Sequence, residues 1–221
     1  MSSAAANRPA VTAGPDGADL LRISPVIPVV VLHDVEQAVP VAQALVRGGV
    51  RVIEITLRTP VAVEAIHRVA REVPEMHVGA GTVITPEQAV AAKEAGSRFL
   101  VTPGCTARLL DAVLDTGLPV LAGASTLTEM LRLAEYGLRA LKFFPAEASG
   151  GRAYLAAVQG PLPGLIFCPT GGVTLANAPG YLALPNVACV GGSWLTPPDV
   201  VDACDWTRVE HLARQAASLS V

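Results

Sequence analysis

One lysine stands inside an otherwise apolar run, where a charged side chain is costly to bury. Lys142 lies in the segment 140–145 (ALKFFP), whose other residues are typical of a buried strand. Burial disfavours an ammonium ion and lowers the pKa of a lysine, and a neutral amine can attack a carbonyl carbon to form a Schiff base. This placement predicts covalent amine catalysis by Lys142.

A second charged residue interrupts another strand-like run, 88 residues earlier at Glu54 in the segment 52–57 (VIEITL). The two-residue alternation of a strand places Glu54, Thr56 and Arg58 on one side. A carboxyl group in an apolar site can exchange protons near neutral pH, and an arginine can hold a substrate carboxylate through two hydrogen bonds. The alternative is a structural ion pair between Glu54 and Arg58. The presence of Lys142 favours the catalytic interpretation.

Two glycine turns follow the last two strand-like runs, at Thr170-Gly171-Gly172 and at Gly191-Gly192-Ser193. Backbone N–H groups of such turns, together with the N-terminus of a short following helix, form a cradle for an anion, and Ser193 adds a hydroxyl donor. One pair of glycines usually marks only a turn, but two pairs at the last two strands are more specific. They predict a phosphorylated substrate.

In the run 77–83 (HVGAGTV), the residues just before Thr82 are only glycine and alanine. Such small residues are expected where a ligand approaches the backbone closely. Thr82 can hydrogen-bond a substrate carboxylate or carbonyl, or it can be an ordinary strand threonine with a capping role. The small residues of 102–105 and 122–126 leave room for substrate entry. Cys105 is interpreted as a packing residue, because the sequence places no histidine to activate it.

These residues need strands to position them, and the sequence provides eight. Apolar runs begin near residues 26, 52, 77, 99, 119, 140, 165 and 187 and alternate with helical segments. Their spacing fits repeated strand and helix units with parallel strands, which predicts a single-domain α/β fold, the (β/α)8 TIM barrel. Active sites of this barrel lie at the carboxyl ends of the strands. An open doubly wound sheet is the alternative, but the first turn, Leu32-His33-Asp34, lacks its GxGxxG pattern.

Local signals predict where the helices begin and end. N-cap residues with a favourable first turn occur at Asp34, Thr59-Pro60, Thr85-Pro86 and near Thr128-Glu129. Glycines that can close a helix in the left-handed conformation occur at Gly48-Gly49, Gly96, Gly117 and Gly137.

Composition excludes several classes of function. The 221 residues are 51% hydrophobic and 16% charged, which predicts apolar surface that pairs with another subunit. A net charge of -3 without a basic cluster argues against nucleic acid as a partner. Charged residues interrupt every apolar run before it is long enough to cross a membrane. Four cysteines without metal or disulfide spacing fit a cytoplasmic protein.

Residues 1–22 are rich in Ala, Ser, Gly and Pro and lack the pattern of a secretory signal, so we expect a flexible leader followed by the barrel from 23 to 221. The histidines at 33, 67, 77 and 211 never reach the spacing of a metal motif. His33-Asp34 is the one conceivable metal position, and Asp34 is better explained as an N-cap. We therefore expect neither a metal nor a cofactor.

Five ordered motifs resemble one family. They are 53–59 (IEITLRT), 78–82 (VGAGT), 141–147 (LKFFPAE), 168–172 (CPTGG) and 191–194 (GGSW), and the similarity runs from about Val26 to the C-terminus. The pattern resembles the 2-keto-3-deoxy-6-phosphogluconate aldolases. Segments 102–105 and 121–125 are not the commonest forms in that family, which bears on substrate breadth. Residues 56–59 look more like the gluconate type than the related phosphogalactonate type.

The resemblance implies a homotrimeric, metal-free class I aldolase of the Entner-Doudoroff pathway that also cleaves 4-hydroxy-2-oxoglutarate. It implies that Lys142 is the Schiff-base lysine and Glu54 the acid/base group. The implied substrate contacts are Arg58 and Thr82 for the pyruvyl carboxylate, Phe144 for the pocket wall, Thr170 for the hydroxyl at the new carbon, and Gly171, Gly172, Gly191, Gly192 and Ser193 for the phosphate. Two alternatives are a phosphosugar isomerase or epimerase with Glu54 as its base, and a phosphosugar-binding barrel without catalysis.

Overall fold

The computed structural model describes residues 17–219, which form one α/β barrel. Eight strands within this range are all parallel and pair in the order β7-β6-β5-β4-β3-β2-β1-β8. Parallel bridges from Phe167 to Val187 and from Thr170 to Gly191 join β7 to the β8 side and close the ring. The strands are β1 (Val26–Val30), β2 (Val52–Thr56), β3 (His77–Gly81), β4 (Leu100–Val101), β5 (Val120–Ala124), β6 (Ala140–Phe143), β7 (Ile166–Pro169) and β8 (Val190–Gly192).

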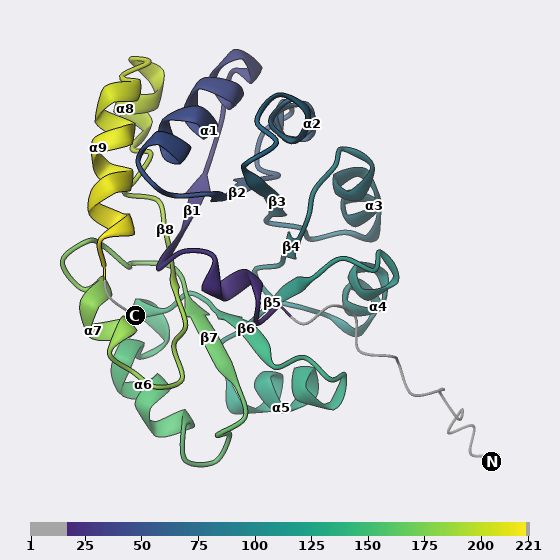
Figure 1. Cartoon of the computed structure of the whole chain (residues 1–221). Helices are drawn as coiled ribbons and strands as arrows, with labels where there is room; N and C mark the ends of the chain where they lie inside the picture. Colours follow the sequence, from purple (N-terminus) through teal and green to yellow (C-terminus); the bar gives the residue numbers. More distant parts are fainter. Residues whose placement is uncertain (1–16, 220–221) are drawn as a thin grey trace.

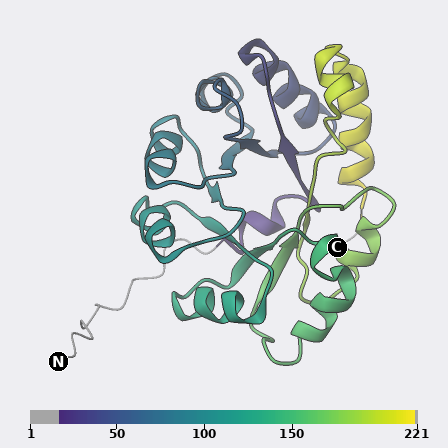
Figure 2. The same ribbon diagram turned by 180° about the vertical axis from the view of Figure 1, so that it is seen from behind.

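Helices surround the strands on the outside, as the two opposite views show (Figures 1 and 2). They are α1 (Ala38–Arg47), α2 (Ala62–Glu72), α3 (Pro86–Glu94), α4 (Ala107–Asp115), α5 (Leu127–Glu135), α6 (Gly151–Val158), α7 (Ala178–Leu182), α8 (Pro198–Asp202) and α9 (Trp206–Ala217), with 3-10 turns η1 (Leu20–Arg22), η2 (Val35–Gln37) and η3 (Glu147–Ser149). Because helices cover the strands outside and side chains fill the barrel, β1, β2 and β5 are buried along their whole length. The predicted (β/α)8 barrel is confirmed.

The predicted strand starts agree with the structure to within one residue for seven strands. The exception is β8, which begins at Val190, because Val187 makes only a single bridge to Phe167 before the strand forms. Of the predicted helix ends, Gly49, Gly96, Gly117 and Gly137 all have positive φ angles. Gly48, by contrast, stays in the right-handed helical conformation.

Three of the four predicted helix starts are right and one is wrong. Asp34 caps η2 by accepting a hydrogen bond from Glu36, and Thr85 forms a capping box with Gln88. Thr59 caps nothing, because its hydroxyl donates to the Leu32 carbonyl at 2.6 Å and α2 begins only at Ala62. The start predicted near Thr128-Glu129 is that of α5, which begins at Leu127 and whose cap, Thr126, forms a capping box with Glu129.

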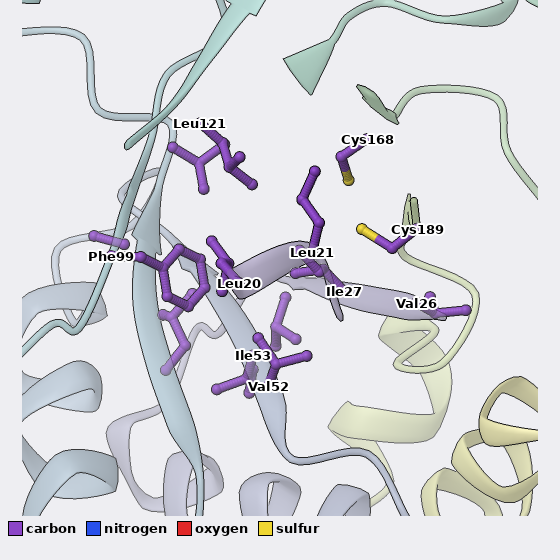
Figure 3. Packing of buried hydrophobic residues seen from close by; sticks show 14 of the residues in the cluster. Leu20, Leu21, Val26, Ile27, Val52, Ile53, Phe99, Leu121, Cys168 and Cys189 are labelled. Carbon is purple, nitrogen blue, oxygen red and sulfur yellow. The ribbon is translucent and has the colours of Figure 1, made fainter. Parts of the chain in front are cut away.

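An apolar plug closes the amino-terminal end of the barrel. The η1 segment, purple in Figure 1, crosses this end of the ring. Leu20 and Leu21 are buried there among side chains of the first residues of the strands (Figure 3). A Cβ on Gly17 would lie 3.3 Å from both Val120 O and Ala140 Cβ, at the starts of β5 and β6.

The sequence predicted a flexible leader over residues 1–22. In the structure, the described part of this segment, 17–22, packs against the core through Leu20 and Leu21. Residues 1–16 lie outside the described residues. None of the helices within 17–219 is long and apolar enough to cross a membrane.

Candidate active site

Lys142 and Glu54 reach each other across the interior of the barrel. Lys142 lies on β6 and Glu54 on β2, four strands apart in the eight-stranded ring. Lys142 Nζ donates to Glu54 Oε1 at 3.1 Å. The side chains are only 6% and 4% exposed. The two charged residues that interrupt apolar runs thus form one buried pair, and Glu54 has its ion pair with Lys142 rather than with Arg58.

The pair places a nitrogen nucleophile within hydrogen-bond distance of a carboxyl group in a site that is closed to water. This distance is short enough for direct proton transfer between the two groups. The Phe144 ring lies 5.3 Å from Lys142 Nζ and provides one wall of this space.

Glycines on β3 make room for these side chains. A Cβ on Gly81 would overlap the Glu54 carboxyl group, and a Cβ on Gly79 would overlap the Phe99 ring. The sequence predicted that the small residues before Thr82 let a ligand approach the backbone. The structure corrects this interpretation, because protein side chains occupy the space next to both glycines.

Thr82 and Arg58 form a second polar pair at the carboxyl end of the neighbouring strands. Arg58 Nε donates to Thr82 Oγ1 at 3.1 Å. Thr82 has a φ of 57°, a left-handed conformation that is unusual for a β-branched residue and that is often found at functional sites. It is therefore not an ordinary strand threonine, and the helix that follows is capped by Thr85 instead.

Thr56 does not share this space in the way that strand alternation suggested. Its hydroxyl donates to the Val30 carbonyl on the adjacent strand at 3.0 Å, and the residue is completely buried. A hydroxyl already bonded to a neighbouring backbone group holds two strands together. Thr56 therefore has a structural role here.

A cavity of about 240 Å³ opens at the carboxyl ends of β1, β2, β6, β7 and β8. Its lining includes eight of the residues predicted from the sequence: Arg58, Phe144, Thr170, Gly171, Gly172, Gly191, Gly192 and Ser193. The other three predicted residues do not line the cavity but contact residues that do. Thr82 accepts a hydrogen bond from Arg58, and the Lys142–Glu54 pair lies beside Phe144. Both glycine turns are on the same side of the barrel as the lysine, as the sequence required.

The glycine turns depend on having no side chains. A Cβ on Gly191 would lie 3.0 Å from Thr170 Cβ and closer still to its hydroxyl oxygen. Gly171 and Gly172 have φ angles of 98° and 79°, which glycine adopts without strain. The short helices expected directly after these turns begin later, at Ala178 and Pro198, so of the groups that the sequence predicted for an anion cradle only the turn backbone and Ser193 lie here.

Sequence reasoning missed three apolar lining residues, Val29, Val31 and Val173. The first two stand at the end of β1 (Val26–Val30) or directly after it, where position alone was a usable signal.

Cys105 is not an activated nucleophile, because burial raises the pKa of its thiol. Within residues 17–219, no three His, Cys, Asp or Glu side chains are grouped so that they could hold a metal ion.

The fold and the site define a TIM-barrel protein with a buried lysine–carboxylate pair beside a cavity that has two glycine turns. The model of the family "KDPG and KHG aldolase" matches residues 18–212, and the chain belongs to this family. KDPG is 2-keto-3-deoxy-6-phosphogluconate, and KHG is 4-hydroxy-2-oxoglutarate. Aldolases are lyases.

Two curated relatives show how close the similarity is. The chain is 51% identical over 197 residues to the KHG/KDPG aldolase of Escherichia coli strain K12, a match that covers 89% of this chain and 92% of that protein. It is 50% identical over 199 residues to the 2-dehydro-3-deoxy-phosphogluconate aldolase of Dickeya dadantii, over 90% of this chain and 93% of the relative.

Two solved structures resemble the whole barrel. The KDPG aldolase of Legionella pneumophila, with pyruvate captured as a covalent carbinolamine, has a TM-score of 0.90 at 42% identity, over 92% of this chain and 99% of that one. The Zymomonas mobilis ZM4 enzyme with 3-phosphoglycerate has a TM-score of 0.89 at 40% identity, over 94% of this chain and 98% of that one.

Proposed function

We propose that the chain is a class I aldolase that reversibly cleaves KDPG to pyruvate and glyceraldehyde 3-phosphate. The observation that carries this proposal is the buried contact of 3.1 Å between Lys142 Nζ and Glu54 Oε1 beside a cavity with two glycine turns. A covalent carbinolamine of pyruvate in the Legionella relative and a phosphorylated acid bound to the Zymomonas relative support it.

Lys142 starts the reaction by covalent attack. After its proton passes to Glu54, the neutral amine adds to C2 of the 2-oxo acid and gives a carbinolamine. Loss of water leaves a protonated imine, which accepts the electron pair of the C3–C4 bond as that bond breaks. Glyceraldehyde 3-phosphate leaves first, and the remaining enamine takes up a proton at C3. Hydrolysis of the imine then releases pyruvate and restores the amine.

Glu54 moves the protons in this scheme. The carboxylate takes the proton of Lys142, returns a proton to the departing hydroxyl of the carbinolamine, and accepts the proton of the C4 hydroxyl during cleavage. Its position 3.1 Å from the reacting nitrogen satisfies the distance that such transfers require. The buried surroundings keep water from competing for these protons.

The remaining predicted residues orient the substrate. Arg58 and Thr82 bind the pyruvyl carboxylate and turn the C3–C4 bond perpendicular to the imine plane, while Phe144 packs against the carbon chain. Thr170 contacts the hydroxyl at C4. The phosphate binds to the backbone N–H groups of the two turns and to the serine hydroxyl, which involves Gly171, Gly172, Gly191, Gly192 and Ser193.

KHG is the second substrate of this proposal, cleaved to pyruvate and glyoxylate. The E. coli relative carries both substrates in its name. KHG shares the 2-oxo acid and the C4 hydroxyl with KDPG and lacks the phosphate. Lys142 and Glu54 therefore serve both reactions, whereas the glycine turns contribute only to the first.

A homotrimeric, cytoplasmic enzyme that works without a metal or cofactor completes the proposal. Apolar side chains that stay exposed on the described surface of one chain fit burial against other subunits: Ile84, Val90, Leu127 and Leu131. Sedimentation of the purified protein tests the trimer. Full activity in a chelator tests the absence of a metal from the reaction.

A cleavage assay separates the aldolase from its rivals. We expect KDPG to yield one equivalent of pyruvate, measured with lactate dehydrogenase. A phosphosugar isomerase or epimerase instead rearranges its substrate without releasing pyruvate, and a binding barrel gives heat in calorimetry without turnover. Either result would replace the aldolase assignment.

A further inference from the structure

The loop that follows Lys142 is bonded to the loop that contains the first glycine turn. Ala146 N donates to Thr170 O at 2.8 Å, and Glu147 N donates to Gly171 O at 3.1 Å. These two hydrogen bonds connect the residues after β6 to the residues after β7. The backbone of Gly171 is therefore positioned by residues 146 and 147.

Gly172 is held from both sides. A Cβ on Gly172 would lie 2.6 Å from Glu147 Cγ, so the Glu147 side chain passes directly over this glycine. Its carbonyl oxygen accepts a hydrogen bond of 3.1 Å from Asn177 Nδ2. The conformation of the turn consequently depends on where the Glu147 side chain lies.

A buried tyrosine holds that side chain in place. The Tyr181 hydroxyl, on α7, donates a hydrogen bond to Glu147 Oε1. Tyr181 has no exposed surface, whereas Glu147 is exposed as a whole residue and would otherwise sample several rotamers. Burial and the neighbouring carboxylate raise the pKa of the Tyr181 hydroxyl, which therefore keeps its proton and remains a donor.

We propose that the hydrogen bond between Tyr181 and Glu147 positions the Gly171-Gly172 turn and thereby sets the affinity of the site for the substrate phosphate. The proposal rests on the phosphate site of the proposed function. Neither residue lines the cavity or takes part in the aldol chemistry, so both are positioning residues. The pair acts on binding of phosphorylated substrates and has no part in recognition of the 2-oxo acid.

Tyr181→Phe tests this proposal, because it removes one hydroxyl and keeps the buried ring. The probe is glycerol 3-phosphate, whose dissociation constant is measured by calorimetry. We expect about tenfold weaker binding, the effect of losing one hydrogen bond to a charged acceptor. The KM for KDPG should rise by a similar factor at unchanged kcat, and the rate of pyruvate trapping by borohydride should stay the same.

Matched variants separate positioning from general damage. Tyr154→Phe removes a hydroxyl on α6, where the ring stacks on Phe143 at 5.5 Å without using that hydroxyl, and should leave phosphate affinity unchanged. Glu147→Gln keeps an acceptor for Tyr181 and should bind phosphate nearly as the parent does. Glu147→Ala should weaken binding as Tyr181→Phe does, and the double variant should lose no more than either one.

Two kinds of result would overturn the proposal, one in probe binding and one in pyruvate trapping. One is unchanged glycerol 3-phosphate affinity in Tyr181→Phe, or an unmodified protein that does not bind the probe at all. The other is an equal loss of pyruvate trapping, which would mean that the hydroxyl supports the whole site. If the unmodified protein traps no pyruvate, the aldolase assignment fails, while the calorimetric comparison still decides whether Tyr181 controls the phosphate turn.

Discussion

The two ends of the barrel differ in what fills the interior of the ring of strands. At the amino-terminal end, Leu20 and Leu21 fill the interior with apolar side chains (Figure 3). At the carboxyl end, Lys142 and Glu54 place a buried ion pair beside a cavity. The end of the barrel at which a side chain lies therefore decides whether it contributes mainly to stability or to chemistry, and substitutions at the two ends should have separable effects.

The largest effect is expected from Lys142→Met, which removes the amine and keeps most of the side-chain volume. Without a nucleophile there is no imine to accept electrons, and we expect a loss of turnover of about 10⁵-fold. The coupled pyruvate assay measures it. Because Glu54 would then be buried without its partner, the single variant should also lose stability.

The double variant Lys142→Met/Glu54→Gln controls for that loss, since it removes both charges together. It should regain much of the melting temperature and none of the activity. Recovery of turnover along with stability would mean that Lys142 serves the fold rather than the reaction.

At the opposite end, Leu21→Ala should cost stability without changing the chemistry. Removal of a fully buried leucine costs about 2–5 kcal/mol, because the plug is left with a cavity. Urea unfolding measures the change, and the KM for KDPG should stay the same. Ile23→Ala is the control, because this side chain is 40% exposed and its loss should cost less than about 1 kcal/mol. A large rise in KM for Leu21→Ala would contradict the separation of the two ends.

Glu54→Gln should reduce kcat by about 100-fold, the usual contribution of a general acid/base. The amide keeps the shape of the side chain but leaves Lys142 buried without its charged partner, so the melting temperature should fall as well. Glu64→Gln makes the same chemical change on the exposed face of α2 and should have no effect on kcat. Near-normal turnover for Glu54→Gln would remove this residue from the proton transfers.

The smallest effect concerns the helix caps around the active-site end. Thr126→Ala removes the hydroxyl that accepts a hydrogen bond from Glu129 N at 3.3 Å, and it should cost about 1 kcal/mol in unfolding free energy. Thr128→Ala, two residues further into α5, should cost no more than about 0.5 kcal/mol. Equal losses would mean that the cap has been assigned to the wrong threonine.

The chemistry could be predicted from the sequence because charge inside an apolar run is a strong signal. Lys142 and Glu54 interrupt two such runs, and once the strands close into a ring the two side chains have nowhere to extend except toward each other. The two glycine pairs were equally visible, because they follow the last two strands at the same end.

Features that depend on contacts between distant segments could not be predicted. Gly81 was predicted to leave room for a ligand, but the structure shows that the Glu54 carboxyl group occupies this room. Thr59 was predicted to cap a helix, but its hydroxyl donates a hydrogen bond to the Leu32 carbonyl on a distant segment. The plug was missed because Leu20 and Leu21 follow a low-complexity segment, and only their burial shows that they belong to the core.

Mass spectrometry after borohydride reduction with pyruvate tests the central claim most directly. The protein should gain the mass of one reduced pyruvate per chain, and peptide mapping should place the adduct on Lys142. Lys93, whose Nζ donates to Thr116 O at 2.7 Å on the outer surface, should stay unmodified. An adduct on a lysine other than Lys142, or no adduct under conditions in which KDPG is cleaved, would contradict the account.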